Sequence, residues 1–450
     1  MRQDRYTMLT TGSVPKVIST LAVPTIISML VTSFYNIADT FFVGKIDTQS
    51  TAAVGVVLSV MFIIQAVGFF FGHGSGNYIS RQLGAQNKEA ASRMAATGFV
   101  YSVIFAASLA VVGLLFLEPI SLALGSTPTV LPYTKRYLSI ILFSAPFMAG
   151  QITLNNQMRF QGNAAYAMVG IVSGAVLNVL LDPLFIFVFD MGVSGAALAT
   201  AVSQFIAFNI QLIQTFRGGN LRIHLNEFTP TSAYIKEIVS GGAPSLTRQA
   251  LGSISAILLN HAAGTWGGDA GIAGMSIVNR ISFFINSVLI GYGQGFQPLC
   301  GFSYGAKLYA RVRQGFWFCV KFGTTFLIVV AVLGFIYAEP IIALFRDDAE
   351  VIAVGAAAFR WQLLTYPLGA IVMFSNMMMQ TIRKPIRASI LSSARQGIFF
   401  IPAILIMPRF WGMPGVEATQ ALADLLSFLL AIPLCGSVLR ELKQEERNRT

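Results

Sequence analysis

Two carboxylates interrupt stretches of the sequence that are otherwise apolar. Asp39 lies within Tyr35-Asn-Ile-Ala-Asp39-Thr-Phe-Phe-Val-Gly, and Asp182 closes Asn178-Val-Leu-Leu-Asp182 before Pro183. Asn178 and Asp182 are four residues apart, so they would share one face of a helix. Pro183 has no backbone N–H and clashes one turn earlier, which would free a carbonyl beside both side chains. Amide, carboxylate and carbonyl oxygens suit a proton or a small hard cation.

Two other interpretations apply to these acids. Asp39 could reach an interface with its carboxylate, and Asp182 could simply end a helix beside a proline. Thr200, which follows in the next apolar stretch, could add a hydroxyl to the pair. We expect Asp39, Asn178, Asp182 and Thr200 to form a proton or cation coupling site, with Na⁺ possible at the first three and no other metal.

A second set of charges is basic. Arg248, Arg280 and Arg395 stand in apolar stretches of the second half, where Glu417 and Asp424 also occur. The arginines could pair with these acids or with backbone carbonyls as structural contacts. Alternatively they line a cavity and attract an anionic or zwitterionic substrate. The residues expected to line a substrate cavity are Tyr35, Asn36, Asn155, Asn156, Arg248, Arg280, Asn376 and Arg395.

The composition decides what kind of protein can hold these residues. Of 450 residues, 55% are hydrophobic and 11% are charged, against about 25% charged in soluble domains. So few charges cannot cover a globule of this size, which excludes a soluble enzyme and a nucleic-acid binder despite the net charge of +11. The sequence has no ATP-binding motif, and its three cysteines lie in apolar runs. We therefore expect an all-α polytopic membrane protein without a cofactor.

A membrane-spanning helix needs about 20 mostly apolar residues. The sequence predicts twelve such spans, at 17–43, 51–78, 93–117, 132–158, 165–189, 193–217, 237–265, 270–299, 312–337, 352–381, 386–407 and 414–439. Positive residues mark the cytoplasmic side. Twenty of the 30 Lys and Arg residues fall on the side that carries both termini, five on the other and five within spans. Both termini are therefore predicted to be cytoplasmic.

The second half of the chain repeats the first at a nearly constant spacing. Pro24 pairs with Pro244, Asn155 with Asn376, and the glycine run 72–76 with 291–295. Each half has six spans, so both insert the same way up, as parallel repeats that often bind substrate at their interface. We predict a six-helix lobe at 1–217, a cytoplasmic linker at 218–236 and a second six-helix lobe with a short cytoplasmic tail at 237–450.

These features resemble the MATE (multidrug and toxic compound extrusion) family, most of all its bacterial MepA-type and DinF-like members. The resemblance covers the whole chain and rests on Ala38 to Gly44, Arg81 to Ala85, Asn178 to Pro183 and Gly192 to Thr200. It implies a V-shaped molecule with a central cavity, and coupling residues at Asp39, Asn178, Asp182 and Thr200. Sodium-coupled members are expected to carry acids in helices 7 and 10, and the interiors of the corresponding spans here have none.

The resemblance implies an efflux antiporter rather than an enzyme, in a prokaryotic plasma membrane. It would export amphipathic, cationic small molecules in exchange for H⁺ or Na⁺. Its partners would be the small-molecule substrate and the lipid bilayer, with no nucleic acid, and it would act as a monomer. One rival is a flippase for a lipid-linked precursor or an exporter of anionic substrates, which the buried arginines favour and the span count opposes. Another is a passive pore, which would need no ion gradient.

Overall fold

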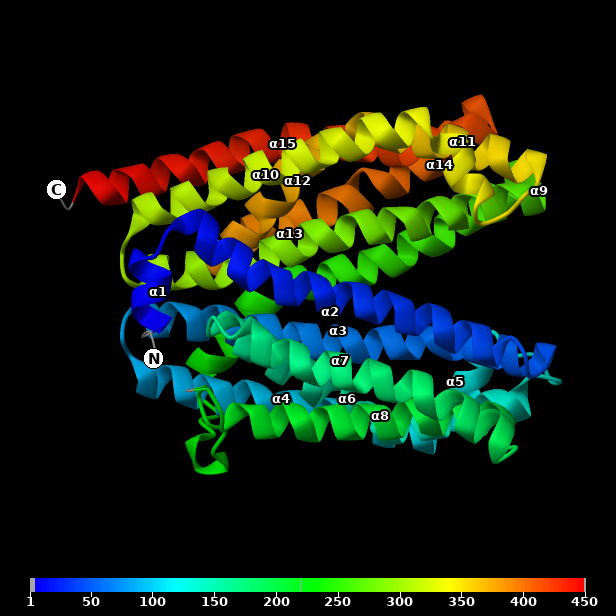
Figure 1. Cartoon of the computed structure of the whole chain (residues 1–450), viewed down its shortest axis with the longest axis horizontal. Helices are drawn as coiled ribbons and strands as arrows, with labels where there is room; N and C mark the ends of the chain where they lie inside the picture. Colours follow the sequence, from blue (N-terminus) through cyan, green and yellow to red (C-terminus); the bar gives the residue numbers. More distant parts are fainter. Residues whose placement is uncertain (1–4, 219, 449–450) are drawn as a thin grey trace. The chain divides into compact units, whose positions relative to one another are not determined.

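The computed structural model describes residues 5–218 and 220–448, and within them it contains helices and no strands (Figure 1). The elements are α1 (Arg5–Thr11), α2 (Val14–Val43), α3 (Thr48–Gly84), α4 (Lys88–Leu115), α5 (Leu117–Ala123), α6 (Leu131–Phe160), α7 (Ala164–Pro183), η1 (Leu184–Val188), α8 (Gly192–Thr215), η2 (Leu225–Glu227), α9 (Ser232–Gly305), α10 (Tyr309–Ile336), α11 (Ala338–Ala343), α12 (Ala349–Thr381), α13 (Pro385–Ser393), η3 (Ala394–Ile398), α14 (Phe400–Trp411) and α15 (Met413–Arg447). The all-α membrane fold predicted from the composition is confirmed.

All twelve predicted spans fall largely on helical segments, although 165–189 runs through α7 and η1, and 386–407 runs through α13, η3 and α14. Two of them, 237–265 and 270–299, lie in the 74-residue α9, which is broken at Gly268 by a φ of 58°. Glycine adopts this left-handed conformation without steric cost. Ten helices of the described chain are long and apolar enough to cross a membrane, counting α9 once. α12 is not among the ten, because polar residues such as Arg360 and Asn376 interrupt its apolar sequence.

The contacts gather the chain into two compact units. The N-terminal unit is Val23–Gly242, and the C-terminal unit joins the residues from Ala243 onward with the segment that ends at Ala22. The boundaries therefore fall within α2 and α9, just before Pro24 and Pro244. The segment 218–236 belongs to the N-terminal unit, where Ser92 donates to Glu227 at 2.6 Å.

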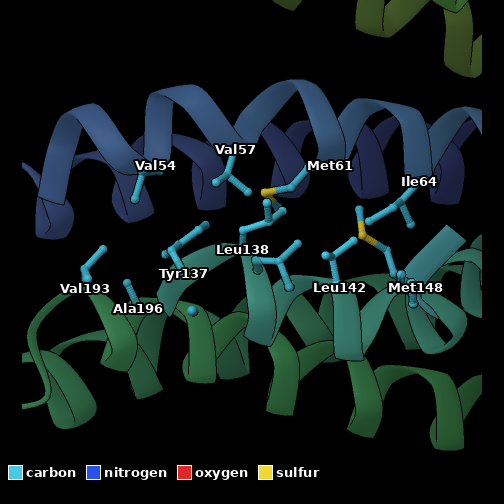
Figure 2. Close-up of a cluster of buried hydrophobic side chains, with 14 of the residues drawn as sticks. Val54, Val57, Met61, Ile64, Tyr137, Leu138, Leu142, Met148, Val193 and Ala196 are labelled. Atoms are coloured by element: carbon cyan, nitrogen blue, oxygen red, sulfur yellow. The ribbon is translucent and has the colours of Figure 1, made fainter. Parts of the chain in front are cut away.

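The N-terminal unit is organised around α6, which packs against α3, α4 and α8 (Figure 1). Apolar residues recur every three or four positions along α3, which places them on one helix face. Figure 2 shows this face meeting α6 and α8 in the buried core of the unit. The labelled residues of that core are Val54, Val57, Met61, Ile64, Tyr137, Leu138, Leu142, Met148, Val193 and Ala196.

Close packing repeats in the two units with the same spacing that separates Asn155 from Asn376. A β-carbon on Gly72 would lie 2.9 Å from Cβ of Asn156, and one on Gly293 would lie 2.2 Å from Sδ of Met377. These contacts pair Gly72 with Gly293, whereas matching the glycine runs in the sequence pairs it with Gly291. That register was wrong because glycine recurs at every second position of the run, so a shift of two positions matches equally well.

Candidate functional site

The first acid of the site comes from the far end of α2. Asp39 lies four residues after Tyr35, so both side chains share one face of the helix. Asp39 is partly buried, and its Oδ1 atom is sealed from solvent without a hydrogen-bond partner. The phenol of Tyr35 lies within electrostatic range of both Asp39 and Asp182. The end of α2 therefore faces α7 within the N-terminal unit.

The second acid lies where α7 ends. Asn178 and Asp182 are 2% and 0% exposed, and they share the helix face predicted from their spacing. After Pro183 the chain continues as the π-helical turn η1, which the sequence did not predict. Such turns are rare and often occur at functional sites. Here η1 lets the helix continue beyond a residue that cannot donate a backbone hydrogen bond.

Two neighbouring helices complete the site. Asn178 Nδ2 donates to Oγ1 of Thr200 on α8 at 3.3 Å. The phenol of Tyr137 on α6 is buried within hydrogen-bonding reach of Thr200 and within electrostatic range of both acids. The structure thus brings Asp39, Asn178, Asp182 and Thr200 together, as predicted from the sequence. Tyr137 was missed because a tyrosine in an apolar run is typical of ordinary packing.

The site is rich in oxygen atoms that have no protein partner. Asp182 Oδ1 and Oδ2, Asn178 Oδ1 and Asp39 Oδ1 are buried, and none accepts a hydrogen bond. Asp39 and Asp182 are close enough to repel each other electrostatically. Neither forms an ion pair with any Lys, Arg or His of residues 5–218 and 220–448. Burying a charge without a partner is costly, so this arrangement favours a proton or a small cation.

The described residues contain no group of three or more His, Cys, Asp and Glu side chains that could hold a metal ion. The oxygen atoms at this site come instead from two acids, an amide and a hydroxyl. Such a set can bind a proton on a carboxylate or coordinate a hard monovalent cation, because both prefer oxygen.

The other predicted cavity residues of the N-terminal unit have different surroundings. Asn36 is exposed, although it directly follows Tyr35. Asn155 Nδ2 donates to the carbonyl of Ala167 at 2.8 Å. Asn156 accepts a hydrogen bond from Arg159 and donates to the carbonyl of Ile152. The two asparagines of α6 thus bind neighbouring backbone and side chains of their own unit.

The remaining predicted residues belong to the C-terminal unit. Asn376 Nδ2 donates to the carbonyl of Ala388 at 2.6 Å and to Ser392. Arg280 is exposed on α9, and Arg248 is half-buried on the same helix. Arg395 forms an ion pair with Asp424, which is the structural pairing expected for one of the three arginines.

An all-helical polytopic membrane protein with paired acids in its apolar interior has the character of a membrane transporter. The chain belongs to the MatE family, whose model matches residues 24–184 and again residues 244–405. The two matches begin at Pro24 and Pro244, the paired prolines of the repeat. The family predicted from the sequence is therefore confirmed.

Curated relatives cover nearly the whole chain. The chain is 26% identical over 435 residues to the multidrug export protein MepA of Staphylococcus saprophyticus, covering 96% of each sequence. It is 26% identical over 434 residues to the protein of the same name from Staphylococcus haemolyticus, covering 96% of this chain and 95% of that one. These relatives are multidrug exporters by name.

Solved structures share the fold. The chain superposes with a TM-score of 0.91 on an outward-facing conformation of a multidrug resistance MATE family transporter of the MOP superfamily, at 25% identity, covering 97% of this chain and 98% of that one. The match to a MOP superfamily transporter from Pyrococcus furiosus, described as having a binding pocket of reverse polarity, has a TM-score of 0.91 and 25% identity, covering 98% of this chain and 99% of that one. The chain is thus a multi-pass membrane transporter of the MATE type.

Proposed function

We propose that this protein is a secondary-active multidrug efflux antiporter that exchanges amphipathic cationic molecules for protons. The observation that carries the proposal is the carboxylate of Asp182, whose two oxygens are both buried without a hydrogen-bond donor near Asp39. The names of the relatives support multidrug export. The bacterial relatives favour a location in a prokaryotic plasma membrane, and the positive residues of the loops favour cytoplasmic termini. The protein would work as a monomer, with only its substrate and the bilayer as partners.

The coupling follows from the energetics of two like charges in an apolar setting. Two acids that close cannot both stay ionised without a compensating charge, so they titrate as a pair and share the first proton. A proton or Na⁺ that enters from outside would neutralise the pair, and its loss to the inside would restore the repulsion. The two occupancies favour different packing of α2 against α7, which is the differential interaction that alternating access needs. The hydrogen bond between the amide of Asn178 and the hydroxyl of Thr200 would keep both groups beside the acids.

The test is gradient-driven uptake of a fluorescent organic cation, ethidium, into inverted membrane vesicles. Wild type is compared with Asp39→Asn and Asp182→Asn under an imposed proton gradient, and separately under a sodium gradient. Both variants should lose uptake while reaching the membrane in normal amounts. Asp190→Asn is the matched control, because Asp190 is exposed in the loop after η1 and its φ of 52° suits asparagine.

Each result has a defined meaning. Uptake under the proton gradient alone would make H⁺ the coupling ion, and uptake under the sodium gradient alone would make it Na⁺. Uptake by wild type without any gradient would identify a passive pore and overturn the proposal. Normal gradient-driven uptake by Asp182→Asn would show that the buried acid does not couple transport.

A further inference from the structure

A second polar site lies within the membrane-spanning helices of the C-terminal unit. Arg395 on η3 donates from Nε and Nη2 to the two carboxylate oxygens of Asp424 on α15, at 2.6 and 3.3 Å. Gln420, one turn before Asp424 on α15, donates to the same carboxylate at 2.8 Å. Asp424 is thus held by three hydrogen bonds and fixes the plane of the guanidinium.

This pairing occupies only one edge of Arg395. Nη1 has no partner among the described residues, and Nη2 keeps a second hydrogen. The side chain of Arg395 is 32% exposed, whereas that of Asp424 is 4% exposed. The acid is therefore sealed behind the arginine, and the free edge of the guanidinium remains accessible. That edge has the fork geometry that binds a carboxylate or phosphate through two hydrogen bonds.

The backbone at Arg395 differs from the matching part of the first repeat. The N–H of Phe399 donates to the carbonyl of Ala394 at 3.1 Å, which is the five-residue spacing of a π-helical turn. In the two units, Gly195 packs on the backbone of Phe185 and Gly415 on that of Met407. Asn155 and Asn376 bind matching carbonyls, those of Ala167 and Ala388. The chain from Ala388 to Met407 is one residue longer than the chain from Ala167 to Phe185. The extra residue falls in the stretch that contains η3, where an inserted turn often marks function.

A second guanidinium lies on the helix that packs against η3. Gly252 and Ser255 of α9 both contact Gln396, the residue after Arg395. Arg248 lies one turn before Gly252 on the same face of α9. No hydrogen bond or ion pair joins Arg248 to any described residue. An arginine inside a membrane bundle is costly unless it meets a partner or water, so the position of Arg248 favours an anion as its partner.

We propose that Arg395, held by Asp424 and Gln420, forms with Arg248 a site for the carboxylate or phosphate group of a bound molecule. The site would extend the substrates from simple cations to zwitterionic amphiphiles that carry both charges. Arg248 and Arg395 together outweigh the single charge of Asp424, and Glu417 lies two helical turns away on α15. The claim that the bound molecule is an exported substrate rests on the proposed export function. Binding at this site can be measured without transport.

Two probes isolate the anionic group. Rhodamine 6G is a cation, and rhodamine 19 is the same fluorophore with the ester replaced by a free carboxylate. Binding of each to the purified protein is measured at equilibrium by fluorescence anisotropy, in nanodiscs of neutral phosphatidylcholine. Wild type should bind rhodamine 19 about tenfold more tightly than rhodamine 6G, since hydrogen bonds between two charged groups are stronger than neutral ones.

The variants remove guanidiniums without leaving a buried acid alone. Arg248→Gln and the double variant Arg395→Gln/Asp424→Asn should each lower the preference for rhodamine 19 at least fivefold. Arg409→Gln removes the same charge from an exposed position on α14 and should keep the wild-type preference. A wild type that binds both dyes equally overturns the inference, as does a preference that survives in both variants. Because no gradient is applied, failure of ion-coupled export in vesicles would not affect this result.

The same assay separates two sources of the anion. If a lipid headgroup fills the site, nanodiscs that contain phosphatidylglycerol should weaken rhodamine 19 binding to wild type several-fold beyond their effect on the double variant. If the site serves transported solutes, wild type and the double variant should respond equally to the anionic lipid. Either result keeps the anion site and assigns its occupant.

Discussion

Asn155 Nδ2 binds the carbonyl oxygen of Ala167 at 2.8 Å, and this bond joins α6 to α7 across the turn between them. Both groups are buried. The same bond recurs at the matching place of the second repeat, from Asn376 to the carbonyl of Ala388 at 2.6 Å. In each repeat this side chain ties the first turn of the next helix to the helix before it. In the N-terminal unit that helix carries Asn178 and Asp182.

Replacing Asn155 by leucine should destabilise the protein. The change keeps the size of the side chain but removes the buried hydrogen bond from Asn155 to Ala167, whose loss is worth about 0.5–1.5 kcal/mol. The apparent melting temperature of the purified protein in detergent should fall by several degrees. Asn209→Leu is the control, because the side chain of Asn209 donates to the Phe205 carbonyl in a solvent-exposed bond within α8. Equal melting temperatures for the two variants would contradict a structural role for Asn155.

Gly74 should not tolerate alanine. A β-carbon there would lie 2.3 Å from the carbonyl oxygen of Ile238, so α3 and the first part of α9 would have to separate. Overpacking of this kind costs about 1–3 kcal/mol. Gly55, on the same helix, has nothing within 4 Å of such a β-carbon. Gly55→Ala should therefore leave the melting temperature unchanged or raise it. An equal fall in melting temperature in both variants would show that the close contact at Gly74 does not cause the loss of stability.

The sequence predicted the fold well because hydropathy and repetition are properties of long segments. The two acids of the proposed coupling site could be picked out from the sequence because a carboxylate in an apolar span is costly and therefore conspicuous. The π-helical turns η1 and η3 were not predicted, because one extra residue leaves no periodic mark in a run that is apolar on all sides. Asn155 could not be distinguished from a cavity residue by its type alone, since an amide serves either role. Its backbone partner is visible only in the packed structure.

Thr200 should tune the coupling site. Its Oγ1 accepts the hydrogen bond from Asn178 at 3.3 Å, so Thr200→Val removes the acceptor and keeps the shape. A lost neutral hydrogen bond is worth about 0.5–1.5 kcal/mol, which corresponds to a roughly 2–10-fold lower rate of gradient-driven ethidium uptake. Thr200→Ser should restore most of the rate, because it returns the hydroxyl. A serine variant as slow as the valine variant would assign the effect to packing instead.

The ion pair between Arg81 and Glu237 should be the one that stability depends on most within the N-terminal unit. Its atoms Nη2 and Oε2 are 2.8 Å apart, and the side chains are 9% and 16% exposed. Removing one partner of a buried ion pair costs up to about 3–5 kcal/mol, so Glu237→Gln should lower the melting temperature. The double variant Arg81→Gln/Glu237→Gln should recover much of that loss because no buried charge remains. Glu89→Gln breaks the exposed pair with Arg93, whose side chains are 48% and 74% exposed, and should change stability by less than about 0.5 kcal/mol. A Glu237→Gln protein as stable as Glu89→Gln would mean that solvent reaches Arg81 and compensates its charge.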